Sequence, residues 1–180
     1  MKAKGSVYAG VLLVLLLLLA SVAEAQQAQP EERRTGRFAF GAGLGFAGDT
    51  PDGTAFALGV SGDYYLTHEL SIGPLLQMGF TGDLFQLGLT GQIKYTFDLP
   101  QIPALKPHIE AGIGFIYADL DRPGGGGDDT SFLIPIGLGA EYKLNSRISL
   151  DTTLLFNFTD LNVRDENFFI TWLLGVKFPF

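Results

Sequence analysis

The feature of this 180-residue sequence that most restricts its fold is a two-residue period running from Arg37 to Phe180. In the first stretch, Phe38, Phe40, Leu44 and Phe46 alternate with small or polar residues. Side chains of a β-strand point alternately to two faces, whereas a helix repeats every 3.6 residues, so this pattern predicts strands. Eight segments share it, at approximately residues 37–47, 54–66, 69–81, 84–97, 106–118, 131–144, 147–158 and 167–180.

The composition indicates a membrane protein. Of all residues, 47% are hydrophobic and only 17% are charged, which is too little charge to cover an ordinary soluble surface. The net charge of −7 argues against a nucleic-acid partner, which would need a clustered basic surface. Cysteine is absent, so disulfides and thiolate metal sites are excluded.

Alternation alone leaves open which face lies inside. A soluble lipocalin-like barrel would turn its apolar face inward, and a membrane barrel would turn it outward. After residue 25, every aromatic residue except Tyr65 and Phe169 falls on the apolar face, while the other face is rich in Gly and Ala. The interior of an eight-stranded barrel is too narrow for so many rings. The sequence therefore predicts an all-β, eight-stranded antiparallel up-and-down transmembrane β-barrel with its aromatic face in lipid.

The N-terminal residues differ from the rest of the chain. Lys2 and Lys4 precede an apolar run over residues 11–20 and the small-x-small site Ala23-Glu24-Ala25, which indicates a signal peptide over residues 1–25. An uncleaved anchor is the alternative, although the run is short for a spanning helix. Residues 26–36 are polar and predict a flexible periplasmic tail, and residues 37–180 form the barrel.

Charged residues on the small-residue face form a candidate site, because they would lie at similar depth in the lumen. The members of this expected charge network are Asp63, Lys94, Glu110, Glu141, Asp151 and Lys177. Strand adjacency predicts the pairs Lys94 with Glu110 and Asp151 with Lys177, which offset the desolvation of buried charges. Glu141 would have to reach across the lumen or to Arg147. We interpret the network as a structural polar plug, with a gate in a small pore as the alternative.

Two prolines conflict with an unbroken β-ladder. Pro74 and Pro135 fall inside predicted strands, and each lacks the N–H that a closed sheet uses. We expect a local bulge at each of them rather than a functional gap in the wall.

Together, these features resemble the small bacterial outer-membrane barrels of the OmpA, OmpX and OmpW kind. The similarity rests on the leader, the eight segments, the hairpins Tyr64-x-Leu66 to Ile72 and Tyr142-x-Leu144 to Leu150, and the last strand. Gly175, Phe178 and Phe180 match the assembly signal of that family. The resemblance implies an outer-membrane location, contact with outer-membrane lipid and lipopolysaccharide, recognition by periplasmic chaperones and the barrel insertion machinery, and a monomer.

The residues give little support for an enzyme. His68 and His108 both map to the periplasmic end, and no activated nucleophile is recognisable by spacing, so we expect no catalysis, no cofactor and no metal. The outer loops carry ten acidic residues against Arg122 and Arg164. A solvated surface explains this charge, and divalent-cation bridging to lipopolysaccharide is the alternative.

The function that we expect is structural, in envelope integrity, with the lumen closed by the charge network. The alternative is a narrow porin-like channel for small or apolar solutes, because Leu75, Ile116, Leu133, Leu155 and Phe169 face an otherwise Gly- and Ala-lined upper lumen.

Overall fold

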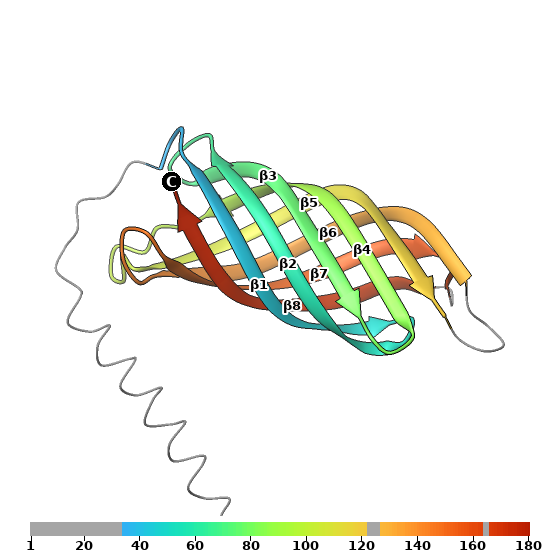
Figure 1. The fold of residues 1–180 in the computed structure, drawn as a ribbon. Coiled ribbons are helices and arrows are strands. Elements are labelled where there is room, and N and C mark those ends of the chain that lie inside the picture. The colour runs from blue at the N-terminus through green and yellow to red at the C-terminus, as the bar shows by residue number, and fades with distance from the viewer. Residues whose placement is uncertain (1–33, 122–126, 164–165) are drawn as a thin grey trace, which may run out of the picture. The chain divides into compact units, whose positions relative to one another are not determined.

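The computed structural model describes residues 34–121, 127–163 and 166–180, and the strands among them form a closed barrel (Figure 1). The strands are β1 (Phe38–Thr50), β2 (Gly53–Tyr65), β3 (Leu70–Phe80), β4 (Leu84–Thr96), β5 (Leu105–Leu120), β6 (Gly127–Lys143), β7 (Ser149–Leu161) and β8 (Glu166–Pro179). The predicted signal peptide over residues 1–25 lies outside the described residues. No helix within the described ranges is long and apolar enough to cross a membrane.

Every strand pairs antiparallel with its neighbours in sequence, and β8 returns to pair with β1. This last seam runs from Ala39 opposite Pro179 to Gly48 opposite Ile170, and Figure 1 shows it as the blue strand beside the red one. A closed sheet leaves no strand edge with unpaired N–H and C=O groups, which is the condition for crossing hydrocarbon. The predicted fold class and strand order are confirmed.

The two faces of the strands differ as predicted. On the outer face, Leu89, Ile113 and Phe115 are 57%, 70% and 69% exposed, whereas Leu133 and Leu155 on the inner face are completely buried. Tyr65 and Phe169, the two aromatic residues expected inside, are both buried. A belt of exposed apolar side chains therefore surrounds a filled lumen, as lipid solvation of the outer face requires.

Aromatic rings pair across neighbouring strands near both ends of the barrel. At the end that holds Arg34 and the C-terminal Phe180, hereafter the terminal end, the rings of Phe38 and Tyr64 have centroids 4.8 Å apart. At the opposite end, hereafter the loop end, the centroids of Phe80 and Phe85 are 5.6 Å apart. Aromatic residues at both rims are typical of barrels whose interfaces lie at the headgroups.

Strands β5 and β6 extend further toward the loop end than the sequence predicts. They pair as far as Asp119 with Asp128 and Leu120 with Gly127, beyond the expected limits at residues 118 and 131. Asp119, Asp128, Asp129 and Thr130 are polar and Leu120 is the single large apolar residue of the added part, so no two-residue apolar period reveals it. Main-chain pairing and the buried side chain of Leu120 hold this part of the hairpin.

The prediction of a bulge at Pro74 and at Pro135 is wrong. Pairing between β2 and β3 stops after Ser61 opposite Leu75, leaves two residue pairs unformed, and resumes without a change of register. Pro135 interrupts the pairing of β5 with β6 in the same way. Each proline stays paired with the strand on its other side, so a missing N–H is accommodated by local loss of pairing and needs no extra residue.

The two-faced wall gives a direct test at mid-strand. We expect Leu89→Arg to lower the free energy of unfolding by about 2–4 kcal/mol, because it places a charge in lipid near the bilayer midplane. Ser146→Arg, in the exposed turn after β6, is the matched control and should change it by less than about 0.5 kcal/mol. Reversible unfolding in lipid vesicles measures both, and equal costs would contradict the assignment of the faces.

Candidate functional site

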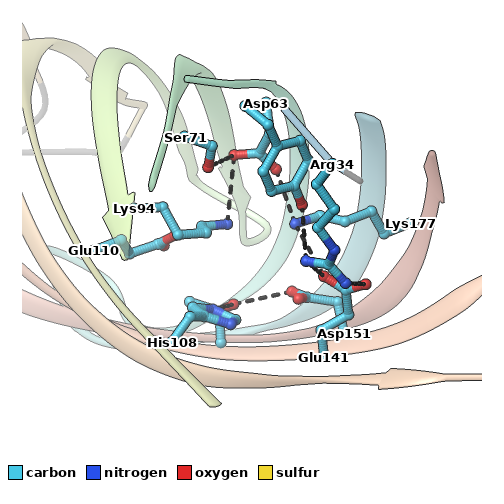
Figure 2. Close-up of polar contacts among 11 residues, drawn as sticks. Arg34, Asp63, Ser71, Lys94, His108, Glu110, Glu141, Asp151 and Lys177 are labelled. Atoms are coloured by element: carbon cyan, nitrogen blue, oxygen red, sulfur yellow. Dashed lines mark hydrogen bonds and ion pairs between the residues drawn. The ribbon is translucent and has the colours of Figure 1, made fainter. Parts of the chain in front are cut away.

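The six residues of the expected charge network all line the lumen toward the terminal end. Asp63, Lys94, Glu110, Glu141 and Lys177 are each no more than 6% exposed, and Asp151 is half-buried. Figure 2 shows the labelled side chains converging from several strands into one interior space. Charges buried to this extent require partners, so their contacts decide what the site can do.

Lys94 makes the ion pair that strand adjacency predicts. The register places Lys94 directly opposite Glu110, and Lys94 Nζ lies 2.8 Å from Glu110 Oε2. The same Nζ lies 3.8 Å from Asp63 Oδ1, across β3. Lys94 therefore neutralises one carboxylate on the adjacent strand and contributes to a second.

The predicted pairing of Lys177 with Asp151 is wrong. The register places Gly175 opposite Asp151 and Ser149 opposite Lys177, an offset of two residues from the expected adjacency. Lys177 Nζ instead lies 2.8 Å from Asp63 Oδ2 and 3.7 Å from a Glu141 oxygen. The long lysine side chain reaches these carboxylates across one intervening strand on each side, β1 for Asp63 and β7 for Glu141, so pairing of adjacent strands does not predict the contacts.

Asp151 belongs to a separate hydrogen-bonded group. The Thr153 hydroxyl donates to Asp151 Oδ1 at 3.0 Å, and the same hydroxyl lies 3.2 Å from His108 Nε2. Asp151 Oδ2 has no hydrogen-bond partner within the described part of the chain. His108 thus meets a hydroxyl rather than the glutamate two residues away that an acid–base pair would use.

Arg34 is the member of the site that the sequence analysis missed. Its guanidinium donates to Glu141 Oε1 at 3.0 Å and to the Tyr65 hydroxyl at 3.3 Å. The last three residues of the predicted tail, 34–36, are therefore held against the barrel, and the rest of that segment lies outside the described residues. The sequence does not predict this contact, because the polar segment before β1 has no periodic pattern that would indicate a partner.

The lumen toward the loop end is filled by apolar side chains. Leu75, Ile116, Leu133, Leu155 and Phe169, which the channel alternative would use as a lining, pack together with no more than 7% exposure. Further from the charges than Leu75 and Leu155, Gln77 donates to Asn157 at 3.2 Å, and Asn157 donates to the Thr171 hydroxyl at 3.0 Å. The interior thus has charges toward the terminal end and an apolar region toward the loop end, with a polar hydrogen-bonded group embedded in the apolar region.

A small cavity lies between the charges and the apolar side chains Leu75, Leu155 and Leu173. It has a volume of about 40 Å³ and is lined by side chains that include Ser61, Asp63, Lys94, Asp151 and Lys177. A second space, of about 10 Å³, lies beside Phe169 and Thr171. Room for one or a few waters matches the polar lining of the first cavity, but neither volume accommodates an organic solute.

The turn between β4 and β5 carries a separate ion pair at the terminal end. Lys106 Nζ donates to Asp98 Oδ1, and His68 Nε2 lies 3.0 Å from Asp98 Oδ2. The pKa of Asp98 lies below its ordinary value: partial burial raises it, and the hydrogen bond and charge of Lys106 lower it by more. His68 therefore ties two turns together rather than facing a substrate space.

The described residues contain no group of three or more His, Asp or Glu side chains arranged to hold a metal ion. At the loop end, Asp129 accepts hydrogen bonds from the Asn162 main-chain N–H at 2.8 Å and from its side-chain amide at 3.0 Å. Asp129 therefore holds the segment after β7 against β6.

The residues of the expected assembly signal form the closing seam. Phe178 lies opposite Phe40, and the Phe180 N–H donates to the Phe38 carbonyl at 2.7 Å. Gly175 lies opposite Gly43, where a Cβ on Gly175 would come within 2.2 Å of the Ala42 carbonyl oxygen. Glycine is thus needed here for close approach of two backbones, independently of any recognition during assembly.

Comparison with known proteins agrees with this architecture. The family described as "Outer membrane protein beta-barrel domain" matches residues 12–180. The chain belongs to that family. As a member of it, the protein is an outer-membrane β-barrel, and no curated protein matches its sequence.

Solved structures share the fold of this outer-membrane barrel. Neisserial surface protein A is 19% identical with a TM-score of 0.66, covering 83% of this chain and 100% of its own. The N-terminal barrel domain of OprF from Pseudomonas aeruginosa is 15% identical with a TM-score of 0.63, with the same coverage. OprG from the same organism is 14% identical with a TM-score of 0.58, covering 84% and 99%. At these identities, the likeness shows the fold alone.

The ion pair of Lys94 predicts a strong and cooperative effect on stability. Lys94→Met should lower the free energy of unfolding by about 3–5 kcal/mol, because Glu110 loses its close partner while buried. Replacing both Lys94 and Glu110 by Met should recover most of this loss, since Asp63 keeps Lys177. A double-mutant cycle in detergent measures the coupling, and a value near zero would reject the pair.

Lys106→Met is the matched control for that cycle. Its partner Asp98 has a side chain that is 33% exposed, so water replaces the lost lysine. We expect a cost below about 1 kcal/mol.

The closing seam gives a second stability test. Gly175→Ala should lower the free energy of unfolding by about 1–3 kcal/mol, because the new methyl group meets main-chain atoms that cannot move aside independently. Gly48→Ala lies in the same seam, and its Cβ would meet nothing within 4 Å, so a change below about 0.5 kcal/mol is expected. Equal effects in urea unfolding would mean that the strands do not approach this closely.

Proposed function

We propose that the protein is a structural barrel of the outer membrane that supports envelope integrity and has a closed lumen. The observation that carries the proposal is the filling of the lumen at two levels by different chemistry. An apolar layer occupies the loop end, and paired charges occupy the terminal end. A solute would have to displace both layers to cross.

The apolar layer opposes the passage of ions and water. Leu133 and Leu155 are fully buried, and Phe169 is 3% exposed, so these side chains pack together with little contact to solvent. Displacing such side chains costs their packing and leaves nothing to solvate an ion.

The charge layer opposes the passage of apolar solutes. An apolar solute at that level would separate Lys94 from Glu110, or Lys177 from Asp63, and leave buried charges unpaired. The two layers therefore exclude different classes of solute, which supports a structural role over the channel alternative.

A non-catalytic role is part of the proposal. His68 bridges toward Asp98 in a turn, and His108 is 2% exposed beside Thr153. Neither histidine borders a space that admits a lipid or peptide substrate, as general acid–base chemistry would require.

The orientation and partners complete the proposal. A cleaved signal peptide over residues 1–25 would deliver the chain to the periplasm, with the terminal end facing that compartment. The protein would be a monomer, with its apolar belt in contact with lipid. At the loop end, Asp83, Asp121 and Asp128 are exposed and acidic, so contact with lipopolysaccharide would require bridging divalent cations.

Uptake of a hydrophobic fluorescent dye by intact cells tests the role, because the two functions predict opposite signs. If the barrel is structural, deleting the gene in the native host should increase dye entry, and restoring the unmutated chain should reverse it. If it is a channel for apolar solutes, deletion should decrease entry. A decrease would overturn the structural role.

Planar-bilayer recording tests closure directly. We expect no steady conductance from the unmutated protein, with a general porin in the same bilayer as the positive control. Steady single-channel steps would reject the closed lumen.

A further inference from the structure

The segment before β1 turns back over the rim of the barrel. The Arg37 N–H donates to the Arg34 carbonyl at 3.0 Å, and the Gly36 N–H donates to the Tyr65 carbonyl at 2.8 Å. Gly36 has φ of +78°, in the left-handed region that favours glycine. This turn fixes the direction in which Arg34 leaves the main chain, and its side chain enters the mouth of the lumen (Figure 2).

The receiving groups match a guanidinium in shape and charge. Both terminal nitrogens of Arg34 face the Glu141 carboxylate, at 3.0 and 3.5 Å, in a two-pronged arrangement. Arg34 Cζ lies 5.3 Å from the centroid of the Tyr65 ring, whose hydroxyl accepts a further hydrogen bond. A planar fork, a carboxylate and an aromatic ring form the arrangement that selects arginine over lysine.

The charges of the lumen require a cation at this place. Lys177 lies 2.8 Å from Asp63 but 3.7 Å from Glu141, so it neutralises Glu141 only in part. Arg34 provides the close partner. Its side chain is 17% exposed, whereas Glu141 behind it is 6% exposed, so the guanidinium lies between the carboxylate and the solvent at the mouth.

We propose that the terminal mouth of the barrel is a guanidinium-binding site, formed by Glu141 and Tyr65, which the chain fills with its own Arg34. Arg34 acts as an internal plug that separates the water-sized cavity beside Ser61 and Lys177 from the periplasm. When Arg34 leaves, the site accepts another guanidinium, such as a small soluble one or an arginine of a periplasmic peptide. The apolar layer stays closed, so release of Arg34 opens only the part of the lumen toward the terminal end and creates no channel.

The absence of cysteine from the chain allows a clean accessibility test. Ser61→Cys places a thiol beside the cavity, and Ala57→Cys places one in the buried apolar layer. A small water-soluble alkylating reagent is applied to the folded full-length barrel in detergent. The measurement is the rate of alkylation of each thiol with and without Arg34.

We expect Arg34→Ala to speed alkylation of the Ser61→Cys thiol by at least about tenfold, as when a minor open state becomes the major one. Arg147→Ala, which removes an exposed arginine from another turn at the same end, should leave the rate unchanged. The Ala57→Cys thiol should stay unreactive in both backgrounds. An unchanged rate at Ser61→Cys, or parallel labelling at Ala57→Cys, would overturn the plug.

Methylguanidinium tests the chemistry of the site. At millimolar concentration it should slow alkylation in the Arg34→Ala protein, whereas tetramethylammonium chloride at equal concentration should not. Adding Glu141→Gln should abolish this protection. No protection by methylguanidinium, or equal protection by tetramethylammonium, would overturn the guanidinium site.

Gly36→Ala tests the turn without touching the lumen. A Cβ at Gly36 would meet nothing within 4 Å, so the change strains only the main chain. It should raise the alkylation rate to a value between those of the parent and Arg34→Ala, whereas Gly82→Ala, an open loop position without positive φ, should not. Conductance separates this inference from the proposed function. Faster alkylation in Arg34→Ala without any conductance supports both. Steady conductance of the unmutated protein would reject the closed lumen of the proposed function but not the guanidinium site.

Discussion

The need to satisfy every main-chain hydrogen bond inside a bilayer governs the rest of this structure. Closure of β1 onto β8 meets that need, since it leaves no sheet edge. Closing with only eight strands makes the lumen narrow enough for side chains to fill. The close approach at Gly175 and the crowding of the interior are therefore consequences of one constraint.

In the filled lumen, apolar and charged side chains occupy different depths. Near the loop end, Leu133 and Leu155 exclude water, so charges there would have no solvation. Toward the terminal end, carboxylates and lysines pair between adjacent strands and also across one intervening strand, as Lys177 does with Asp63 across β1. The exclusion of solutes thus follows from how the interior is stabilised and needs no dedicated gate.

The sequence predicted what depends on local periodicity and strand order. The faces, the strand order and the pair Lys94 with Glu110 follow from alternation and adjacency. The partner of Lys177 does not, because the two-residue offset in register and the contact with Asp63 across β1 both depend on the closed barrel. The effect of Pro74 was misjudged for a related reason: its other edge remains paired, so the ladder tolerates a gap.

Arg34 illustrates why the charge layer is incomplete without residues outside the sheet. Among the described strand residues, Asp63, Glu110 and Glu141 form ion pairs with Lys94 and Lys177, while Lys106 opposite Glu141 pairs with Asp98 instead; Asp151 adds a fourth carboxylate at the side. Another lysine would supply the charge, but it could not bind both oxygens of Glu141 with two nitrogens or stack on the ring of Tyr65 as a guanidinium does. An arginine remains charged in a partly buried site and satisfies a carboxylate with two nitrogens at once. The polar segment before β1 therefore belongs to the electrostatics of the barrel, and its sequence is constrained by the lumen that it closes.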